Sequence, residues 1–398
     1  MGRSPSPSPG TSTGITVIGG GLAGLTAAIT AAEAGARVTL HEAHHTLGGR
    51  ARTAEGPYAV NEGPHALYWR GPHWDWLRQR GLLGPLANLP LREAARFRFH
   101  HGGALRRIPP VGLFALARRS AEQAPADVDF LTWATERAGE ATARAAAHYV
   151  AVALFHHDPG SLSAAFVQER LRRAAALPPE ARYPAGGWGR LTERMAGHAW
   201  NLGVRIETST RIDTLPDGPV IVATSLDAAR NLLKDDGLHW PSGRTLLLDL
   251  ALRTRRGDPF VVSDLDAPGW LERFTAQDPS LAPAGEQLIQ GQIPIGPDAP
   301  RAEALARAEH LLDLGFPDWR ERTVWRREAL ANGRTGAVDP PGTTWRDRPR
   351  IDRGGSGVFL AGDQVAAPGV LSEVAFTSGI TAASLALKAL AGVSAGGA

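Results

Sequence analysis

The sequence contains no cysteine among its 398 residues. This absence excludes disulfides, thiolate-bound zinc, iron–sulfur clusters and thiol nucleophiles, so any redox chemistry must depend on a cofactor. No uninterrupted apolar run approaches the roughly 20 residues that a membrane-spanning helix needs. The opening segment, MGRSPSPSPGTST, lacks the apolar core of a signal peptide. We therefore expect a cytoplasmic protein with a disordered tail over residues 1–13.

Lysine is nearly absent, since only Lys234 and Lys388 are present. Arginine supplies the rest of the 43 basic residues, and these are interspersed with 40 acidic residues to give a formal net charge of +3. No long basic block occurs, so the charge pattern gives no reason to expect a nucleic-acid partner. The content of 43% hydrophobic and 21% charged residues is ordinary for a globular protein.

A glycine-rich turn near the N-terminus carries the most specific signal in the sequence. Gly19, Gly21 and Gly24 form GxGxxG between a β-rich run, ITVIG, and an apolar segment that we expect to be helical over residues 22–34. In this context the first glycine permits a tight turn, the second lets the backbone approach a pyrophosphate, and the third lets the helix pack on the strand. Glu42 ends the next expected strand, where a carboxylate accepts hydrogen bonds from a ribose 2′-hydroxyl and disfavours a 2′-phosphate.

Three further blocks complete a resemblance that spans the chain. LGGRART follows Glu42, YPAGGWGRLTERMAGHAWNLGVRI begins at residue 183, and LAGDQVAAPGVLSEVAFTSGITAA lies near the C-terminus. Together with GxGxxG, these motifs resemble the FAD-dependent superfamily of amine oxidases, protoporphyrinogen oxidases and phytoene-desaturase-like enzymes. The closing motif resembles the phytoene-desaturase-like branch most.

The resemblance implies positions that bind FAD. The ADP half would be bound by Gly19, Gly21, Gly24, Glu42, Gly49 and Arg50. Ile212, on an expected strand after GVRIETST, would pass near the adenine, and Gly362 and Asp363 would hold the ribityl end. Leu371 and Ala375 would lie beside the flavin, where the N-terminal dipole of a helix over residues 372–391 favours negative charge on the reduced ring. We expect Ser372 to cap this helix and Gly392 to stop it.

The alternation of strands and helices, read with this resemblance, predicts an α/β fold. A discontinuous Rossmann-type FAD-binding domain would comprise residues 14–88, 186–236 and 341–398. A mixed, helix-rich substrate domain would be inserted as residues 89–185 and 237–340, with its first part mostly helical.

Other motif matches are weaker. HEAHH, over residues 41–45, has the spacing of a zinc-protease helix, but it straddles a strand end and a loop, so we expect no metal site.

No second GxGxxG occurs, which gives no sign of a separate NAD(P)H domain. We therefore expect a small-molecule substrate to reduce the flavin, and oxygen, a quinone or another acceptor to reoxidise it.

The sequence signals for a substrate site are less specific than those for FAD. His65, Tyr58 and Tyr68 are the polar candidates for a catalytic role, although all three could instead be packing or structural residues. Tyr183 and Trp188 flank a glycine-rich turn and could either line the cavity or pack. RRIPPVGLFALARR, over residues 106–119, could dip into a membrane surface or form an ordinary packed helix.

These observations predict an FAD-dependent oxidase, dehydrogenase or desaturase acting on a C–H bond of a small, largely apolar substrate. The lack of lysine near the closing motif weighs against a typical amine oxidase, which remains an alternative. A non-redox isomerase or cyclase on the same fold is another.

Overall fold

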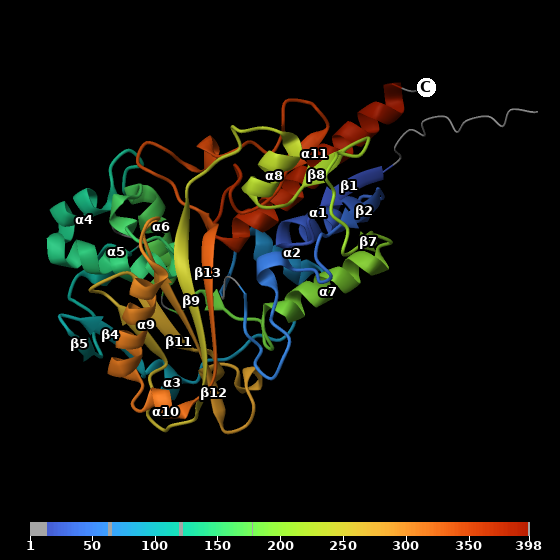
Figure 1. Ribbon diagram of the computed structural model, residues 1–398. Coiled ribbons are helices and arrows are strands. Elements are labelled where there is room, and N and C mark those ends of the chain that lie inside the picture. Colours follow the sequence, from blue (N-terminus) through green and yellow to red (C-terminus); the bar gives the residue numbers. More distant parts are fainter. Residues whose placement is uncertain (1–13, 63–65, 119–121, 177, 397–398) are drawn as a thin grey trace, which may run out of the picture.

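The computed structural model describes residues 14–62, 66–118, 122–176 and 178–396, with side chains described up to residue 392. The described elements form two large sheets and one two-stranded sheet, with helices packed against both large sheets (Figure 1). The fold is α/β with a discontinuous Rossmann-type part and an inserted mixed part, as the sequence predicts.

The first sheet is parallel and has five strands. Its order is β14 (Val358–Leu360), β8 (Val220–Val222), β1 (Gly14–Ile18), β2 (Arg37–His41) and β7 (Arg205–Glu207). Short runs rich in Val and Ile form these strands because a parallel sheet is buried on both faces. Helices α1 (Leu22–Glu33) and α11 (Ser372–Gly396) pack on each other and on this sheet. The strands come from three separate stretches of the chain, so this part assembles only when distant segments meet.

The second sheet has seven strands in the order β13, β9, β12, β11, β10, β4 and β5. Their bounds are Thr323–Ala337, Ser242–Arg253, Glu286–Pro294, Gly269–Arg273, Val261–Asp264, Phe97–His101 and Ala104–Arg106. One face packs on α9 (Arg301–Gly315), because alternate residues of β9 from Leu246 to Leu252 point to that helix. The opposite face turns toward the segment around Val60 and carries buried polar side chains such as Asp249 and Gln290.

Further helices cover the remaining surfaces. Helices α4 (Phe130–Ala138), α5 (Glu140–Leu154) and α6 (Ala164–Ala174) form a separate apolar cluster beside the second sheet, as seen at the left of Figure 1. The others are α2 (Pro72–Gln79), α3 (Leu91–Ala94), α7 (Trp188–Asn201), α8 (Leu226–Leu233) and α10 (Trp319–Arg322), with a two-stranded sheet of β3 (Leu67–Tyr68) and β6 (Ala181–Arg182).

Three local expectations were wrong. Residues 97–106 form the hairpin β4–β5 rather than helix, because β4 pairs with β10 in the second sheet. The strand expected to reach Ile212 ends at Glu207, since Ser209 adopts a left-handed φ of 54° and turns the chain. Helix α11 continues through Gly392. A side chain at this position would contact nothing within 4 Å, so the glycine costs the helix no packing contact.

Helix α11 is the one helix of the described part that is long and apolar enough to cross a membrane by length and composition. Val374, Phe376, Ala382 and Ala386 of this helix are buried in the same core as α1. Its apolar character is therefore accounted for by packing inside the fold.

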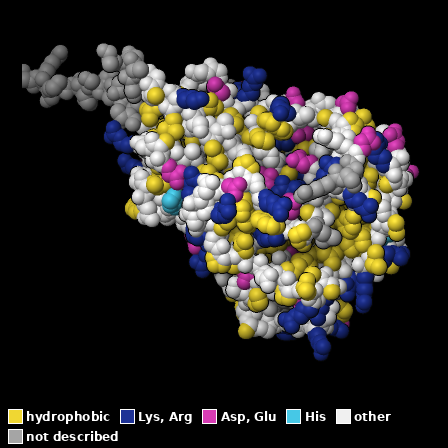
Figure 2. All heavy atoms as spheres, turned by 180° about the vertical axis from the view of Figure 1, so that it is seen from behind, with side chains coloured by type: hydrophobic (Ala, Val, Ile, Leu, Met, Phe, Trp, Pro, Cys, Tyr) yellow, Lys and Arg dark blue, Asp and Glu magenta, His cyan; other side chains and the backbone are white. Residues whose placement is uncertain are grey.

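Figure 2 shows one face of the molecule from behind. Acidic and basic side chains are interspersed over this face, while hydrophobic side chains gather in its lower right part, on the side of the second sheet.

Candidate FAD and substrate site

The glycine-rich turn connects β1 to α1 as the spacing predicts. Gly19 has φ of 107°, and a Cβ at Gly24 would lie 1.8 Å from the Gly19 carbonyl oxygen, so both positions require glycine. The N-terminus of α1 begins after Gly21 and has no side-chain cap. Its first backbone N–H groups are therefore available to an anion, which is the geometry that binds a pyrophosphate.

A second glycine pair faces this turn. The Gly48 N–H donates to the Gly20 carbonyl oxygen at 2.8 Å, and Gly21 and Gly48 form an isolated bridge. A Cβ at Gly21 would meet only the Gly48 carbonyl oxygen, at 3.9 Å, and one at Gly49 would meet only the Gly21 Cα, at 3.6 Å. Side chains at these two positions would fill a cradle that the bare backbones leave open. The residues present thus fit the pyrophosphate of FAD.

Glu42 lies directly after β2 and is held by the backbone. Its two carboxylate oxygens accept hydrogen bonds from the N–H groups of Gly20, at 2.7 Å, and His44, at 2.8 Å. Each oxygen retains a lone pair for a ribose hydroxyl. The Thr210 N–H donates to the Glu42 carbonyl oxygen at 2.8 Å, so the loop that contains Ile212 begins beside Glu42 although Ile212 is not on a strand.

Arg50 and Asp363 lie together. Arg50 follows the Gly48–Gly49 pair, and its guanidinium donates to both Asp363 carboxylate oxygens at 2.6 and 2.7 Å. It also donates to the Arg334 carbonyl oxygen at 2.8 Å. Asp363 follows Gly362, whose φ of 155° carries the chain out of β14. The resemblance assigned these two residues to different parts of FAD, whereas the structure joins them in one ion pair.

The start of α11 is built differently from the expectation. Ser372 is the first helical residue, and its buried Oγ has no hydrogen-bond partner, so it does not cap the helix. Instead the Glu373 carboxylate accepts a hydrogen bond from the Val370 N–H at 3.0 Å. Leu371 adopts a left-handed φ of 53° just before the helix, and Ala375 is buried in its first turns. A strained backbone at this point is a feature often found at functional sites.

The two catalytic candidates that the structure describes, Tyr58 and Tyr68, have different partners. His65 lies outside the described residues. The Tyr58 hydroxyl donates to Glu286 at 2.7 Å, and its ring packs on Trp325 of β13. Tyr68 lies on β3 under the Arg173 guanidinium, which is 4.7 Å from its ring centroid. Burial raises the pKa of each phenol to about 12, so both tyrosines are neutral at physiological pH.

A buried charged group lies beside Tyr68 and has no signature in the sequence. Arg173 of α6 donates to Glu373 of α11 at 2.7 Å and also pairs with Glu180. His73 of α2 is fully buried with its Nε2 hydrogen-bonded to the Tyr68 carbonyl oxygen at 2.7 Å and its Nδ1 3.8 Å from Glu373. No sequence pattern links these residues, because they come from separate elements. Among the described residues no group of three or more His, Asp or Glu has the arrangement of a metal site.

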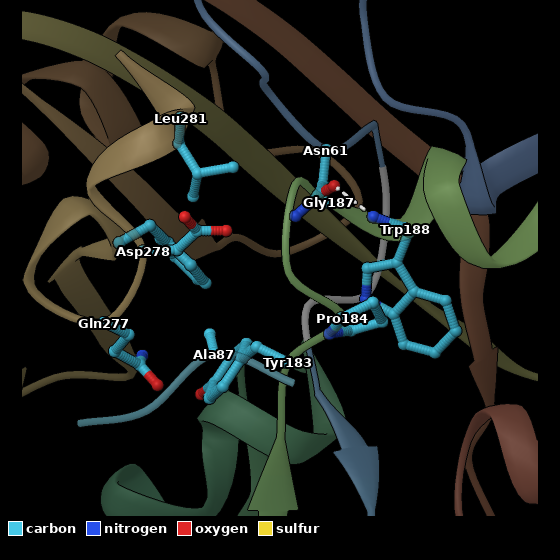
Figure 3. A pocket seen from close by; sticks show the side chains of 10 residues that line it. Asn61, Ala87, Tyr183, Pro184, Gly187, Trp188, Gln277, Asp278 and Leu281 are labelled. Carbon is cyan, nitrogen blue, oxygen red and sulfur yellow. Dashed lines mark hydrogen bonds between the residues drawn. The ribbon is translucent and has the colours of Figure 1, made fainter. Parts of the chain in front are cut away.

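A small hollow of about 10 Å³, room for about one water molecule, opens between segments that flank the two large sheets (Figure 3). Tyr183 and Trp188, for which the sequence allows either a lining or a packing role, both line it, together with Asn61. Gln277, Asp278 and Leu281 approach from the second sheet's side, and Phe274 also lines the hollow. The hollow is bounded by residues of both parts, where substrate sites of two-part enzymes commonly lie.

The fold and the glycine cradle define a dinucleotide-binding flavoprotein. Residues 17–79 match the profile of the NAD(P)-binding Rossmann-like domain, and residues 220–387 match that of flavin-containing amine oxidoreductases. We therefore assign the chain to the superfamily of FAD-dependent amine oxidases and phytoene-desaturase-like enzymes, and it is an FAD-dependent oxidoreductase.

Individual relatives are distant. A carotenoid phi-ring synthase from Streptomyces griseus is 26% identical over 466 residues, covering 94% of this chain and 87% of the relative. An oxidoreductase structure from Methanosarcina mazei superposes with a TM-score of 0.71 at 16% identity, covering 92% of this chain and 99% of the other. Cyclohexylamine oxidase from Brevibacterium oxydans gives a TM-score of 0.68 at 18% identity, covering 94% and 99%. Such low identities establish the shared fold and leave the substrate open.

Proposed function

We propose that the protein oxidises a small, largely apolar organic molecule by removing a hydride from a C–H bond. Bound FAD would supply the hydride acceptor, and the protein would supply position and exclusion of water. The observation that carries the proposal is the cradle formed by Gly21 and Gly49 next to Glu42, which fits FAD. Oxygen, a quinone or another acceptor would complete the cycle.

The chain's own residues have distinct parts in this proposal. The α1 N-terminus and the Gly48–Gly49 pair would bind the pyrophosphate, and Glu42 would bind the adenosine ribose. Arg50 would approach the phosphates from its pair with Asp363, while Leu371 and Ala375 would pack beside the flavin. Tyr58 and Tyr68 are neutral hydroxyl groups and would orient rather than deprotonate a substrate.

Two alternatives keep the same fold. A non-redox isomerase or cyclase is one, since reduced UDP-galactopyranose mutase superposes on this chain with a TM-score of 0.66 at 13% identity. An amine oxidase is the other. Lys234, at the end of α8, and Lys388, late in α11, are the two lysines of the sequence, and both are exposed, which disfavours a flavin-side lysine.

The test begins with the visible spectrum of the purified protein before and after acid precipitation. A flavin spectrum in the supernatant, identified as FAD by mass spectrometry, supports the cofactor assignment and non-covalent binding. Colour retained in the pellet would indicate covalent attachment. Candidate substrates are then screened by anaerobic bleaching of the flavin. A substrate converted without net bleaching or acceptor consumption would favour the non-redox alternative, and a colourless protein that cannot be reconstituted would overturn the proposal.

A contact with a membrane surface is a further part of this proposal. The segment after β5 does not form a long helix, since it turns and then makes a short 3-10 helix over Leu113–Ala115. Ile108 and Val111 project from it with 77% and 95% of their surface exposed, close to Arg106 and Arg107. Apolar tips flanked by arginines suit an anionic lipid surface.

A further inference from the structure

An ion pair lies on the face of the second sheet that turns away from α9. Arg327 of β13 and Asp249 of β9 are opposite each other in the strand register, and the Arg327 Nε–H donates to the Asp249 carboxylate at 2.8 Å. Asp249 is 3% exposed, and its other carboxylate oxygen accepts from the Gln290 side-chain N–H at 2.6 Å. Asp249 is thus held from two sides and in turn fixes the Arg327 guanidinium over β9.

The terminal amino groups of Arg327 are left unused. A guanidinium carries five N–H donors, and Asp249 accepts only from the one on Nε. In the part of the chain that the structure describes, no hydrogen bond uses the other four, and no second acidic group pairs with Arg327. The side chain is 28% exposed, so these donors are accessible. Because Arg327 reaches inward to β9 from the edge strand of the sheet, they lie over the sheet rather than beyond its edge.

The two faces of β13 are covered differently. Arg326 and Glu328 point to α9 and pair with residues of that helix at 2.8 and 2.6 Å. On the face of Arg327, Ala329 lies opposite Leu247 of β9 in the register. Ala329 is exposed, and Leu247 is partly exposed although strands flank β9 on both sides. This face therefore has open apolar surface directly beside Arg327.

Strand β13 (Figure 1) connects this open surface to residues that we propose to bind FAD. Near its end, the Arg334 carbonyl oxygen accepts from Arg50 at 2.8 Å, and a Cβ at Gly336 would lie 3.5 Å from the Leu371 side chain. At a rise of about 3.3 Å per residue, roughly 23 Å of strand separates Arg327 from Arg334. A molecule bound along this face would have one end at Arg327 and the other toward the flavin.

The charges around Arg327 leave it as the group available to a ligand. Asp249 is its partner, and Glu62, which acts electrostatically on Asp249, is itself paired with Arg52 at 2.9 Å. Each of these acidic groups thus has a basic partner, while Arg327 retains unused donors. A planar guanidinium binds both oxygens of a carboxylate at once, which makes that group its best-matched ligand.

We infer that Arg327, positioned by Asp249, binds a carboxylate group of the substrate, whose apolar body lies over Ala329 and Leu247. This inference rests on the proposed function and narrows its substrate class from apolar molecules in general to apolar carboxylic acids in their ionised form. Arg327 contacts the substrate, and Asp249 is a positioning residue that acts through Arg327.

The test compares octanoate with octanamide, which have the same chain and nearly the same shape but differ in charge. Their dissociation constants on the FAD-loaded protein are measured by ligand-observed NMR titration at about pH 7.5, where the acid is ionised. Octanoate should bind roughly 10- to 100-fold more tightly, the value of one charge-assisted contact. Equal affinities, or no binding of octanoate, would overturn the inference.

Variants assign the preference to one arginine. Arg327→Met should reduce the affinity for octanoate to that for octanamide and leave the latter within about twofold of the parent value. Combining it with Asp249→Asn keeps the test valid if the unpaired buried carboxylate destabilises the single variant. Arg326→Met is the matched control, because Arg326 lies on the α9 face of the same strand and pairs with Glu309. A preference that survives in both Arg327 variants, or that is lost in Arg326→Met, contradicts the inference.

A second pair of variants tests where the apolar body lies. Ala329→Phe should fill the open surface and weaken both ligands about tenfold, so that the preference for octanoate remains. Leu330→Phe is the control, since Leu330 lies opposite Leu246 on the α9 face. Unchanged affinities in Ala329→Phe would overturn this placement. These readouts need no turnover, so their failure is distinct from failure of the proposed function, which shows as absent flavin or absent bleaching.

Discussion

Arg50 and Asp363, which are 313 positions apart in the sequence, are joined by two hydrogen bonds of 2.6 and 2.7 Å. A third hydrogen bond from Arg50 reaches the Arg334 carbonyl oxygen on β13. One guanidinium therefore ties the N-terminal glycine cradle to the C-terminal strand of the first sheet and to the edge strand of the second. Since 39% of the Arg50 side chain is exposed, it can also face a phosphate.

Breaking this pair should weaken FAD binding. Arg50→Met and Asp363→Asn each remove a charge-assisted contact, so we expect the dissociation constant of FAD to rise about 10- to 100-fold. Fluorescence of flavin released on dilution measures it. The double variant should cost little more than either single one, because the two side chains act together. Arg78→Met, which breaks the exposed pair with Asp75, is the control and should leave FAD binding unchanged. Additive losses in the double variant would refute a shared role.

Two helical glycines should respond oppositely to alanine. Gly24→Ala would place a Cβ 1.8 Å from the Gly19 carbonyl oxygen, which must push α1 away from β1. We expect a loss of about 2–3 kcal/mol in the free energy of unfolding and a loss of bound FAD. Gly197→Ala, in exposed open space on α7, should be neutral or stabilising by up to about 1 kcal/mol. Urea unfolding measures both, and equal effects would contradict the close packing at Gly24.

Acid should destabilise the protein partly through His73. Burial lowers the pKa of this imidazole, against the opposing effect of Glu373, so the native state binds fewer protons than the unfolded state does. Its contribution to stability is present above the unfolded pKa of about 6.5 and is lost as the pH falls through the lower native value. The free energy of unfolding, measured by urea titration from about pH 7.5 down to 5, should fall less steeply in His73→Gln than in the parent protein. His148 and His156 are shifted in the same direction, so a residual slope is expected. An unchanged slope would exclude His73 as a contributor.

The apolar tips beside the arginines should carry any membrane contact. Ile108→Asp combined with Val111→Asp should reduce co-sedimentation with phosphatidylglycerol-containing vesicles by tenfold or more, since about 1.5–3 kcal/mol is lost per apolar side chain that leaves the lipid. Trp200→Asp is the control, because Trp200 is also exposed, at 68%, but lies on α7 in the first part. Equal binding to neutral vesicles would show that the arginines do not contribute to binding. No vesicle binding by the parent protein would contradict the proposed membrane contact.

The parts that the sequence predicted well are local. The GxGxxG turn, the strand before it and the helix after it depend on neighbours within a few residues, and the structure places them as expected. The expectations that failed depended on distant partners. Residues 97–106 form a hairpin because β10 offers a free edge to β4, and α11 is tied at its start by Glu373 rather than by Ser372.

The candidate site likewise has a part that local sequence predicts and a part that depends on distant segments. Glycine spacing and a strand-end carboxylate suffice to predict a dinucleotide cradle, because phosphate binding uses backbone groups whose geometry is fixed locally. Tyr58 and Tyr68 are close in sequence and alike in type, yet one bonds to Glu286 and the other lies under Arg173. Which partner a side chain meets is settled by packing between segments.

The sequence by itself determined the cofactor class, the α/β fold and the absence of thiol chemistry. Only the tertiary structure joined Arg50 to Asp363 and brought Arg173 and His73 to Glu373. The physical reason is that backbone turns are encoded by the residues that make them, whereas the charge state of a buried side chain depends on every group that folding brings around it.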